Sequence, residues 1–315
     1  MKKYKIAVFG ASGKTAEAIV RLCRQETSHE VILCSASQKD KFSDMTYKLY
    51  NYKPLDIKGI KNICYSEKPH FIINAAGISD IDTCEINKDL AFKINVNLTE
   101  TLVTICRVLD SHLIMFSTDN IFDGKKGPYT EEDRPEPINY FGKTKHTAEN
   151  TCLAGLDKYT IIRTNWIYGS SSFGRKDFFY EIANNLINNR KIKLCTEQFC
   201  NPTYSLDIAL AVLKIIEKNR TGIYNIAGTD WLSFFNIVRI YCSIFDLNED
   251  LIVPIRYNEI SGNAGRRLKK GGLMTLKAEA DLNIKLTSLK SGLQALRYKS
   301  LNKSKNILSK KIIYY

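Results

Sequence analysis

Long apolar runs and paired cysteines are both missing from this 315-residue sequence. No apolar run reaches the roughly 18 residues that a membrane-spanning helix needs. The nine cysteines are scattered, odd in number and without a Cys-x-x-Cys pair, so neither a zinc site nor a disulfide framework is expected. Unpaired thiols are typical of reducing compartments, and we therefore expect a cytoplasmic protein that requires no metal.

Acidic residues are scarce in the last part of the chain. Residues 251–315 hold 14 Lys and Arg but 3 Asp and Glu, a balance of +11, whereas the first 250 residues hold only +2 of the net charge of +13. A basic C-terminal third suits an anionic ligand such as a nucleotide diphosphate. The tail at 301–315 could instead contact nucleic acid or an anionic membrane surface, or be a solvated end.

Residues 4–23 predict a strand, a tight glycine turn and a helix. The letters SGKT resemble the end of a P-loop, but that motif requires a glycine where Val8 stands. The spacing of Gly10, Gly13 and Ala16 instead fits a dinucleotide-binding turn, in which a helix N-terminus faces a pyrophosphate. The residues expected to contact the cofactor here are Gly10, Ser12, Gly13, Lys14 and Thr15.

No acidic residue stands at the end of the second predicted strand, 29–37. An Asp or Glu about 20 residues beyond the glycine turn would hold the 2′-hydroxyl of NAD(H). Ser35, Ser37 and Lys39 stand there instead, and Lys39, Lys41 or Lys14 could pair with a 2′-phosphate. The sequence therefore favours NADP(H) over NAD(H).

Strands and helices alternate along the rest of the chain. The predicted elements are strands at 71–77, 112–122 and 159–169 and an amphipathic helix at 89–110. This alternation predicts an α/β fold with a doubly wound parallel sheet. Ligands of such sheets lie at the carboxyl ends of the strands, which here are 74–76, 117–119 and 164–166.

Several sequence blocks occur in one order between about residue 4 and residue 300: GASGKTA, LDI at 55–57, FIINAAGISDIDTCE, FSTDNIFDGKKGPYTEEDRPEPINYFGKTKHTAE, IIRTNWIYG, EQFCNPTYSLDIA and GIYNIAG. Together they resemble the dTDP-4-dehydrorhamnose reductase group of the extended short-chain dehydrogenases/reductases. The resemblance implies NADPH-dependent reduction of the C4 keto group of a nucleoside-diphosphate 4-keto-6-deoxy sugar, in surface-polysaccharide sugar biosynthesis.

The same resemblance implies how the chain is divided. A Rossmann domain is expected at 1–168, with 202–228 returning to it. A smaller sugar-nucleotide lobe is expected from 169–201 and 229–300, followed by the basic tail. A homodimer is a further possibility.

The resemblance also implies roles for single residues. Asn95 resembles an asparagine near the proton relay, Thr118 a hydroxyl that hydrogen-bonds the substrate oxygen, and Lys145 the lysine that holds the nicotinamide ribose. Trp166 resembles an indole that packs on the sugar. The other residues implied are Asp56, Ile57, Asn74, Ala75 and Ala76 for the cofactor, and Ser79, Asp119, Arg266 and Arg267 for the substrate, with the two arginines near its diphosphate.

A tyrosine that this resemblance leads us to expect is missing. Protonation of the new alkoxide normally falls to a tyrosine, whose pKa near 10 is lowered by an adjacent Lys⁺. Tyrosine and lysine at i and i+4 share one helix face, but the residue four before Lys145 is Phe141. Tyr140 is rotated by about 100° around the helix, so we expect its hydroxyl to point elsewhere.

Three explanations of Phe141 stay open. The chain could be an engineered Tyr→Phe variant impaired in turnover. It could be a natural enzyme with another acid, such as Thr118 through water or Tyr140 on a distorted helix start. It could also be a non-catalytic NADP(H)-binding regulatory or partner-binding subunit, because the regulatory β subunit of methionine adenosyltransferase resembles the same group. Dehydration is disfavoured, because the pair after Thr118 is Asp119–Asn120 and not Asp–Glu.

Overall fold

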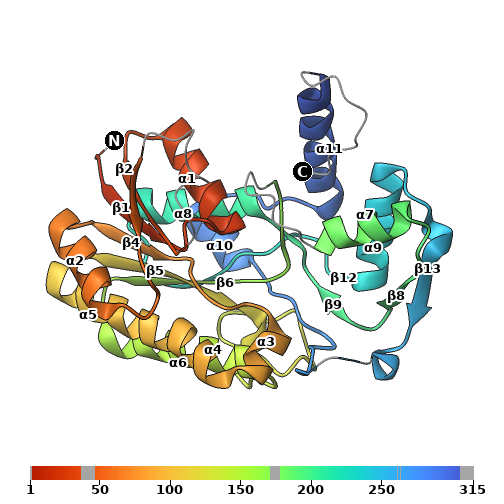
Figure 1. Ribbon diagram of the computed structural model, residues 1–315, viewed down its shortest axis with the longest axis horizontal. Helices are drawn as coiled ribbons and strands as arrows, with labels where there is room; N and C mark the ends of the chain where they lie inside the picture. Colours follow the sequence, from red (N-terminus) through yellow and green to blue (C-terminus); the bar gives the residue numbers. More distant parts are fainter. Residues whose placement is uncertain (1, 37–46, 171–177, 261, 263, 306–315) are drawn as a thin grey trace.

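The computed structural model describes residues 2–36, 47–170, 178–260, 262 and 264–305. Its centre is a seven-stranded sheet in the order β11-β6-β5-β4-β1-β2-β3 (Figure 1), and every neighbouring pair is parallel. The strands are β1 (Lys5–Phe9), β2 (Glu30–Ser35), β3 (Lys48–Asn51), β4 (Phe71–Asn74), β5 (His112–Thr118), β6 (Tyr159–Thr164) and β11 (Gly222–Asn225). The predicted α/β class with a doubly wound parallel sheet is confirmed.

Helices cover both faces of this sheet (Figure 1). One face packs on α1 (Lys14–Glu26), α8 (Ser205–Lys218) and α10 (Leu276–Leu282), and the other on α2 (Ile57–Glu67), α5 (Leu98–Leu109) and α6 (Tyr140–Gly155). Successive strand residues point to opposite faces: Val8 belongs to the first core and Phe9 to the second. Strands buried on both faces read as continuous apolar runs, which is why the sequence pattern located most of them.

A smaller lobe lies beside the carboxyl ends of the strands (Figure 1) and has its own apolar core, to which Tyr168, Phe179, Tyr241 and Leu289 contribute. Its helices are α7 (Phe178–Ile187), α9 (Phe234–Phe245) and α11 (Leu289–Lys305). Its strand pairs are β8 (Ile192–Cys195) with β13 (Ile252–Ile255), β9 (Phe199–Cys200) with β12 (Leu232–Ser233), and β7 (Ile167–Tyr168) with β10 (Thr203–Tyr204). The boundaries expected at 168, 202 and 229 stay predictions.

Several predicted elements are wrong in detail. The helix expected at 89–110 is α4 (Lys88–Phe92), a π-helical turn η2 (Lys93–Asn97) and α5, and the short α3 (Ile81–Ile86) precedes them. The strand expected at 159–169 ends at Thr164, because Trp166 has a φ of +37° that no strand accommodates. The strand expected at 112–122 likewise gives way to a 3₁₀ turn, η3 (Asp119–Ile121). Two further 3₁₀ turns in the described residues are η4 (Glu249–Leu251) and η5 (Tyr257–Glu259).

A buried ion pair fixes α6 against β6. Arg163 donates to Glu149 through Nε at 3.0 Å and through Nη2 at 2.9 Å, and both side chains are nearly fully buried. The third contact of Arg163 is a hydrogen bond from Nη1 to the Glu131 carbonyl oxygen at 3.1 Å. A two-point arginine–carboxylate pair holds its elements in one relative orientation, so α6 has a fixed position over the sheet.

All nine thiols are free and buried. Over the described ranges, no cluster of His, Cys, Asp and Glu side chains could hold a metal ion. None of the helices found in that part of the chain combines the length and apolarity needed to cross a membrane.

His112 at the start of β5 is held neutral. Its Nε2 lies 2.7 Å from Thr160 Oγ1, whose own proton goes to the Arg220 carbonyl oxygen, so Nε2 is the protonated nitrogen. The buried Nδ1 has no hydrogen-bond partner in the described structure. Burial lowers the pKa of His112 from 6.5 to about 4, because a proton on Nδ1 would place an unpaired charge inside the protein.

This histidine predicts a loss of stability in acid. Above pH 6.5 both the folded and unfolded states hold a neutral His112; between pH 6.5 and about 4 only the unfolded state takes the proton. Stability should therefore fall by about 1.4 kcal/mol per pH unit in that window, and by about 3 kcal/mol in all. Urea unfolding at pH 7.5, 5.5 and 4.5 should show a shallower decline for His112→Gln. The exposed His70→Gln should keep the steep decline, and parallel curves for all three proteins would refute the assignment.

Candidate active site

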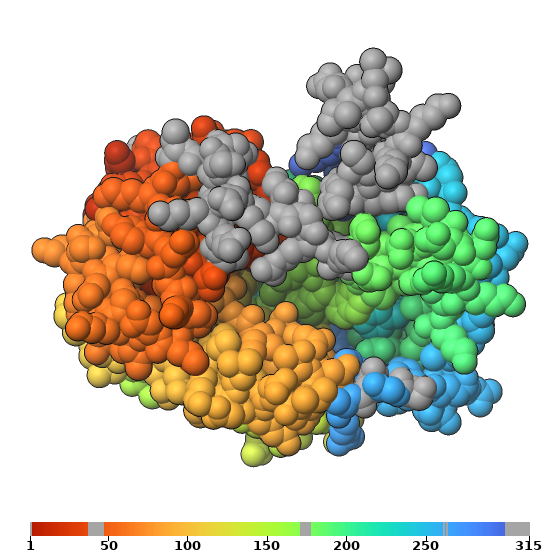
Figure 2. Space-filling view, viewed as in Figure 1, coloured from red at the N-terminus to blue at the C-terminus, as the bar shows by residue number. Residues whose placement is uncertain are grey.

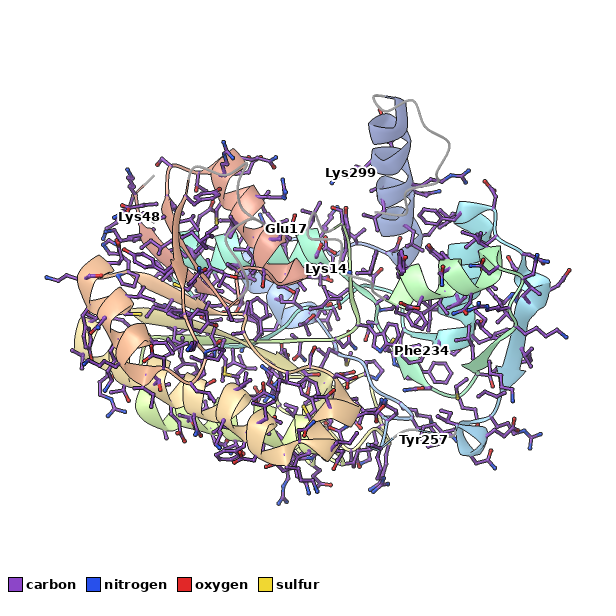
Figure 3. The ribbon with its side chains drawn as sticks, viewed as in Figure 1. Lys14, Glu17, Lys48, Phe234, Tyr257 and Lys299 are labelled. Carbon is purple, nitrogen blue, oxygen red and sulfur yellow. The ribbon has the colours of Figure 1, made fainter. Side chains whose placement is uncertain are left out.

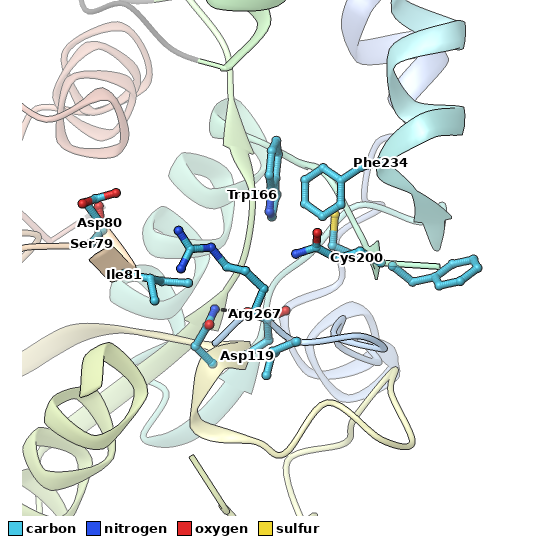
Figure 4. Close-up of a pocket in the computed structure, with 12 residues that line it drawn as sticks. Ser79, Asp80, Ile81, Asp119, Trp166, Cys200, Phe234 and Arg267 are labelled. Atoms are coloured by element: carbon cyan, nitrogen blue, oxygen red, sulfur yellow. Dashed lines mark hydrogen bonds between the residues drawn. The ribbon is translucent and has the colours of Figure 1, made fainter. Parts of the chain in front are cut away.

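Two adjoining cavities lie between the carboxyl ends of the strands and the smaller lobe. The first, here called the sheet cavity, has a volume of about 470 Å³; the second, the lobe cavity, about 200 Å³ (Figure 4). Both are lined by Ser79, Ile81, Asp119, Asn120 and Trp166, so they form one continuous cleft. Figure 2 shows the molecule hollowed between the red and orange surface of the sheet's first elements and the green and blue surface of the lobe.

The sheet cavity collects about half of the residues predicted from the sequence. Its remaining walls include Ser117, Thr164 and Asn165, which lie in the predicted strand ends 117–119 and 164–166 but were given no individual role. The predicted residues that line it are Gly13, Lys14, Thr15, Ala16, Ala75, Ala76, Ser79, Thr118, Asp119, Phe141, Lys145 and Trp166.

The glycine turn after β1 leaves room for an anion. Gly10 has a φ of +79°, and a Cβ there would lie 2.6–2.8 Å from the backbone of Ala75 and Ala76. Gly13 N donates to Gly10 O at 2.9 Å, and α1 then begins without a side-chain cap. Because the first N–H groups of a helix have no intrahelical acceptor, this N-terminus at the cavity wall is suited to a phosphate group.

Asn95 clamps the loop after β4 to α6 from within the π-helical turn. Its Oδ1 accepts from Ile78 N at 2.8 Å, and its Nδ2 donates to Ile78 O and to Thr144 Oγ1, both at 3.0 Å. A Cβ at Gly77 would lie 2.9 Å from Asn95 Oδ1 and 3.3 Å from Lys145 Nζ. Asn95 lines neither cavity, but it lies next to the lysine, and the π-helical turn sets its position.

Lys145 and Phe141 lie one turn apart on α6 and both face the sheet cavity. Lys145 is 9% exposed, and its Nζ donates to Phe116 O at 2.9 Å. Burial lowers the pKa of Lys145 to about 8, against the weaker opposing influence of Cys84, Glu149 and Cys152. Phe141 is 6% exposed and presents a phenyl ring where a phenol would be expected.

Tyr140 does not replace the missing phenol. It lines neither cavity; its ring lies 5.6 Å from Lys88 Nζ, and its backbone N donates to Glu85 Oε1 at 2.8 Å. The helix begins regularly, since Asn139 Oδ1 accepts from Gly142 N at 2.8 Å. The distorted helix start considered from the sequence is therefore absent from α6, and the expectation that Tyr140 points elsewhere is confirmed.

Asp119 joins the two halves of the cleft. Its Oδ2 accepts from Asn165 Nδ2 and from Gly272 N, each at 3.0 Å, and its Oδ1 accepts from Asn120 Nδ2 at 3.0 Å and Thr118 Oγ1 at 3.2 Å. Burial raises the pKa of Asp119, and these four hydrogen bonds oppose that rise. The predicted substrate residue is thus fully engaged with the protein.

Trp166 forms the wall between the cavities. Its ring packs edge-on against Phe178 and Phe234, with centroids 4.4 and 4.0 Å apart. The left-handed backbone at Trp166 is unusual for a bulky residue and is the kind of strain that clusters at functional sites. Figure 3 shows Lys14 and Phe234 approaching the cleft from its two sides.

Of the two arginines predicted to meet the substrate diphosphate, only Arg267 lines a cavity. Arg267 lines the lobe cavity (Figure 4). It pairs with Asp82 through Nη2 at 2.7 Å and Nη1 at 3.1 Å. This pairing lowers the pKa of Asp82. Arg266 is exposed and lines neither cavity; its carbonyl oxygen accepts from Asn139 Nδ2 at 2.9 Å.

The other described residues that were predicted to bind the cofactor do not line the sheet cavity. Asp56 caps α2 by accepting from Gly59 N at 2.9 Å, and Ile57 is 49% exposed; neither lines a described cavity. Ser12 and Ser35 are buried near the glycine turn and at the end of β2. Asn74, at the end of β4, donates to Thr99 Oγ1 at 3.1 Å. Ser37, Lys39 and Lys41 lie outside the described residues.

Ser117 and Thr164 are candidate ligand contacts within the strand ends 117–119 and 164–166, where the sequence predicted the ligand without giving either residue a role. Both side chains are more than nine-tenths buried, both line the sheet cavity, and neither hydroxyl has a hydrogen-bond partner in the described part of the chain. Buried hydroxyls rarely stay unpaired, so a bound molecule is a natural partner. Together with the uncapped α1 N-terminus, they fit a dinucleotide. Their position at strand ends was the only sequence signal.

Comparisons with known proteins show the family of the chain. The family model described as RmlD substrate binding domain matches residues 4–301. The chain is 30% identical to a dTDP-4-dehydrorhamnose reductase of Aggregatibacter actinomycetemcomitans, over 77% of this chain and 78% of that protein. It is 26% identical to methionine adenosyltransferase 2 subunit beta of Xenopus laevis, over 79% and 74%.

A solved structure of similar fold is that of dTDP-4-dehydrorhamnose reductase from Bacillus anthracis str. Ames in complex with NADP. Its TM-score is 0.80 at 22% identity, and the likeness covers 95% of this chain and 100% of that chain.

The hydrogen bonds of Asp119 predict that Asp119→Asn destabilises the fold. An amide in place of the carboxylate turns its NH2 group toward one of the two pairs of donors, either Asn165 Nδ2 and Gly272 N or Asn120 Nδ2 and Thr118 Oγ1, so that pair loses its acceptor. We expect a loss of about 2–4 kcal/mol in the free energy of unfolding, measured by urea denaturation at pH 7. The exposed Asp250→Asn serves as the matched control and should stay within about 0.5 kcal/mol of the unaltered protein. Equal stabilities of the two variants would contradict the role given to Asp119.

Proposed function

The chain belongs to the family of the RmlD substrate-binding domain, and from this premise we propose that it reduces the C4 keto group of a nucleoside-diphosphate 4-keto-6-deoxy sugar with NADPH. The resemblance to the dTDP-4-dehydrorhamnose reductase group of the extended short-chain dehydrogenases/reductases, predicted from the sequence, is confirmed. The relatives that carry the reductase name act in deoxysugar chemistry, and the same class of oxidoreductase is proposed here.

One observation carries this proposal: the same sheet cavity holds the uncapped N-terminus of α1 and the Lys145 ammonium, and it opens into a second cavity with an arginine. When bound, NADPH supplies the hydride. The helix N-terminus would hold the diphosphate of the cofactor, and Lys145 would hold the nicotinamide ribose. The hydroxyls of Ser117 and Thr164, which lack partners in the described structure, would contact the nicotinamide end.

In the proposed complex the lobe cavity receives the sugar nucleotide. Trp166 would pack on the sugar, Thr118 would position its C4 oxygen, and Arg267 would meet the diphosphate after leaving Asp82. Asn95 would act indirectly, by holding the loop after β4 against α6. Asp119 would act by holding Asn165 and Gly272 in the walls of the cleft. Arg266 would contact the ligand only from the cleft's outer edge.

A second candidate function is a non-catalytic NADP(H)-binding regulatory or partner-binding subunit of the same fold. Phe141 favours it, because a phenyl ring cannot give a proton to an alkoxide. The likeness to methionine adenosyltransferase 2 subunit beta gives it a precedent in the family. The presence of Lys145, Thr118 and Trp166 around one cavity favours the reductase function. Such a reductase would work slowly because it lacks the phenol.

Phe141→Tyr tests the reductase proposal. A phenol at this position would face the cavity one turn from Lys145 and supply the proton directly, so kcat should rise by about 10²–10⁴. NADPH consumption is measured with a panel of nucleotide-linked 4-keto-6-deoxy sugars. Tyr140→Phe, one residue earlier and outside the cavity, should leave kcat unchanged. If neither the unaltered protein nor the Phe141→Tyr variant turns over any sugar while both bind NADPH, the regulatory-subunit function replaces the reductase.

Lys14→Ala tests the preference for NADP(H). Lys14 lines the sheet cavity at the start of α1, where its ammonium would pair with the 2′-phosphate. We expect the NADPH dissociation constant to rise about tenfold, the equivalent of one charge-assisted contact, and that of NADH to change by less than about twofold. Titrations of NADPH and NADH fluorescence measure both. An equal loss for the two cofactors would place Lys14 at the shared diphosphate instead.

A further inference from the structure

We infer that Lys145 is itself the proton donor in this chain, passing its proton to the substrate oxygen through a water molecule in the space that a tyrosine hydroxyl would fill. The inference rests on the proposed function, since it names the acid of the same site. It answers the question that Phe141 raises: how an alkoxide formed in this cavity obtains a proton.

The geometry leaves the Lys145 ammonium with donors to spare. Of its three N–H groups, the described structure engages one, with Phe116 O at 2.9 Å. Lys145 and Phe141 lie on the same face of α6, and both line the cavity. Because the phenyl ring ends one oxygen short of a phenol, a water in that space would accept from a free N–H of Lys145 and donate to the substrate oxygen.

The other candidate acids around the cavity are less suited. The Thr118 hydroxyl already donates to Asp119 Oδ1 at 3.2 Å. Burial raises the pKa of the Cys84 thiol to about 11, and its hydrogen bond goes to Ile78 O at 3.5 Å. Asp119 accepts four hydrogen bonds from the protein itself. The four histidines, all within the described ranges, line neither cavity.

The electrostatic surroundings make Lys145 an acid of useful strength. Burial lowers its pKa to about 8, so the ammonium still predominates at pH 7 and gives up its proton far more readily than an exposed lysine. Glu149, the nearest carboxylate on its own helix, is already paired with Arg163. The titratable groups that act on Lys145 are Cys84 of α3 and Glu149 and Cys152 of its own helix. Asp119 of η3 lines the same cavity.

The step balances without a further reactant. The carbonyl carbon of the substrate accepts the hydride, and the electron pair of the broken C=O π bond moves to the oxygen. This oxygen takes a proton from the water as the water takes one from Lys145 Nζ. The sugar is reduced to the alcohol, NADPH is oxidised to NADP⁺, and the neutral amine of Lys145 regains its proton from solvent.

Lys145→Arg is the discriminating variant. Arginine keeps the positive charge and can hold a ribose, but its pKa above 12 prevents it from delivering a proton. We expect kcat of the unaltered protein to fall tenfold per pH unit above about pH 8. In Lys145→Arg, kcat at pH 7 should be about 10²-fold lower and should not decline above pH 8. The exposed Lys143→Arg, on the same helix, should match the unaltered protein.

Lys145→Arg in the Phe141→Tyr protein distinguishes a lysine that donates the proton from one that only positions the ligand. With a phenol present, the loss of kcat caused by Lys145→Arg should be at least about tenfold smaller than the loss in the protein that has Phe141. A lysine that only positioned the ligand would give the same loss in both proteins. Two readouts do not depend on turnover. NMR of ε-¹³C-lysine-labelled protein should show one resonance titrating near pH 8 that Lys145→Arg removes, and NADPH affinity should change by less than about fivefold.

The outcomes distinguish a failure of Lys145 as the proton donor from a failure of the proposed reductase function. An unchanged pH profile in Lys145→Arg, or equal costs in the two backgrounds, would overturn Lys145 as the donor and leave the reductase in place. Turnover by the Phe141→Tyr protein alone would do the same, because the unaltered chain would then have no working acid. No turnover by either protein would refute the proposed function and the inference together.

Discussion

The cleft depends on one buried carboxylate. Asp119 binds its own turn through Thr118 and Asn120, the end of β6 through Asn165, and the returning chain through Gly272, 153 residues further along. These contacts bring the lobe up to the carboxyl ends of the strands, where a doubly wound sheet binds its ligands. A carboxylate this deeply buried is tolerated only because all four of its hydrogen-bond positions are filled. The walls of both cavities follow from that single anchoring point.

The reacting part of the cleft is built around a buried cation. The Arg163–Glu149 pair fixes α6, and Asn95 fixes the loop beneath it, so Lys145 is held in the cavity with its charge largely uncompensated. Such a group binds a polar ligand, gives up its proton easily, or does both. In a relative with tyrosine at position 141 the cation would serve the phenol. With phenylalanine there, the same ammonium is the proton donor that we propose.

Local patterns in the sequence were sufficient for five of the seven sheet strands, the glycine turn and the position of Tyr140, because each depends on residues a few positions apart; β3 and β11 were not predicted. The π-helical turn at Lys93–Asn97 was missed because its residues continue the apolar spacing of an ordinary helix. The partners of Asp119 and Arg267 could not be predicted, since Gly272 and Asp82 are far from them in sequence. The break at Trp166 depends on a backbone conformation that no residue preference indicates. Most of the features that the sequence did not predict therefore depend on contacts between residues far apart in the chain.

A crystal structure of the protein with NADP⁺ would test the central claim, that the sheet cavity is a dinucleotide site. We expect the diphosphate at residues 13–16, the nicotinamide ribose within hydrogen-bond distance of Lys145 Nζ, and new partners for the Ser117 and Thr164 hydroxyls. A dinucleotide bound elsewhere, or a sheet cavity without ligand at saturating NADP⁺, would contradict the account.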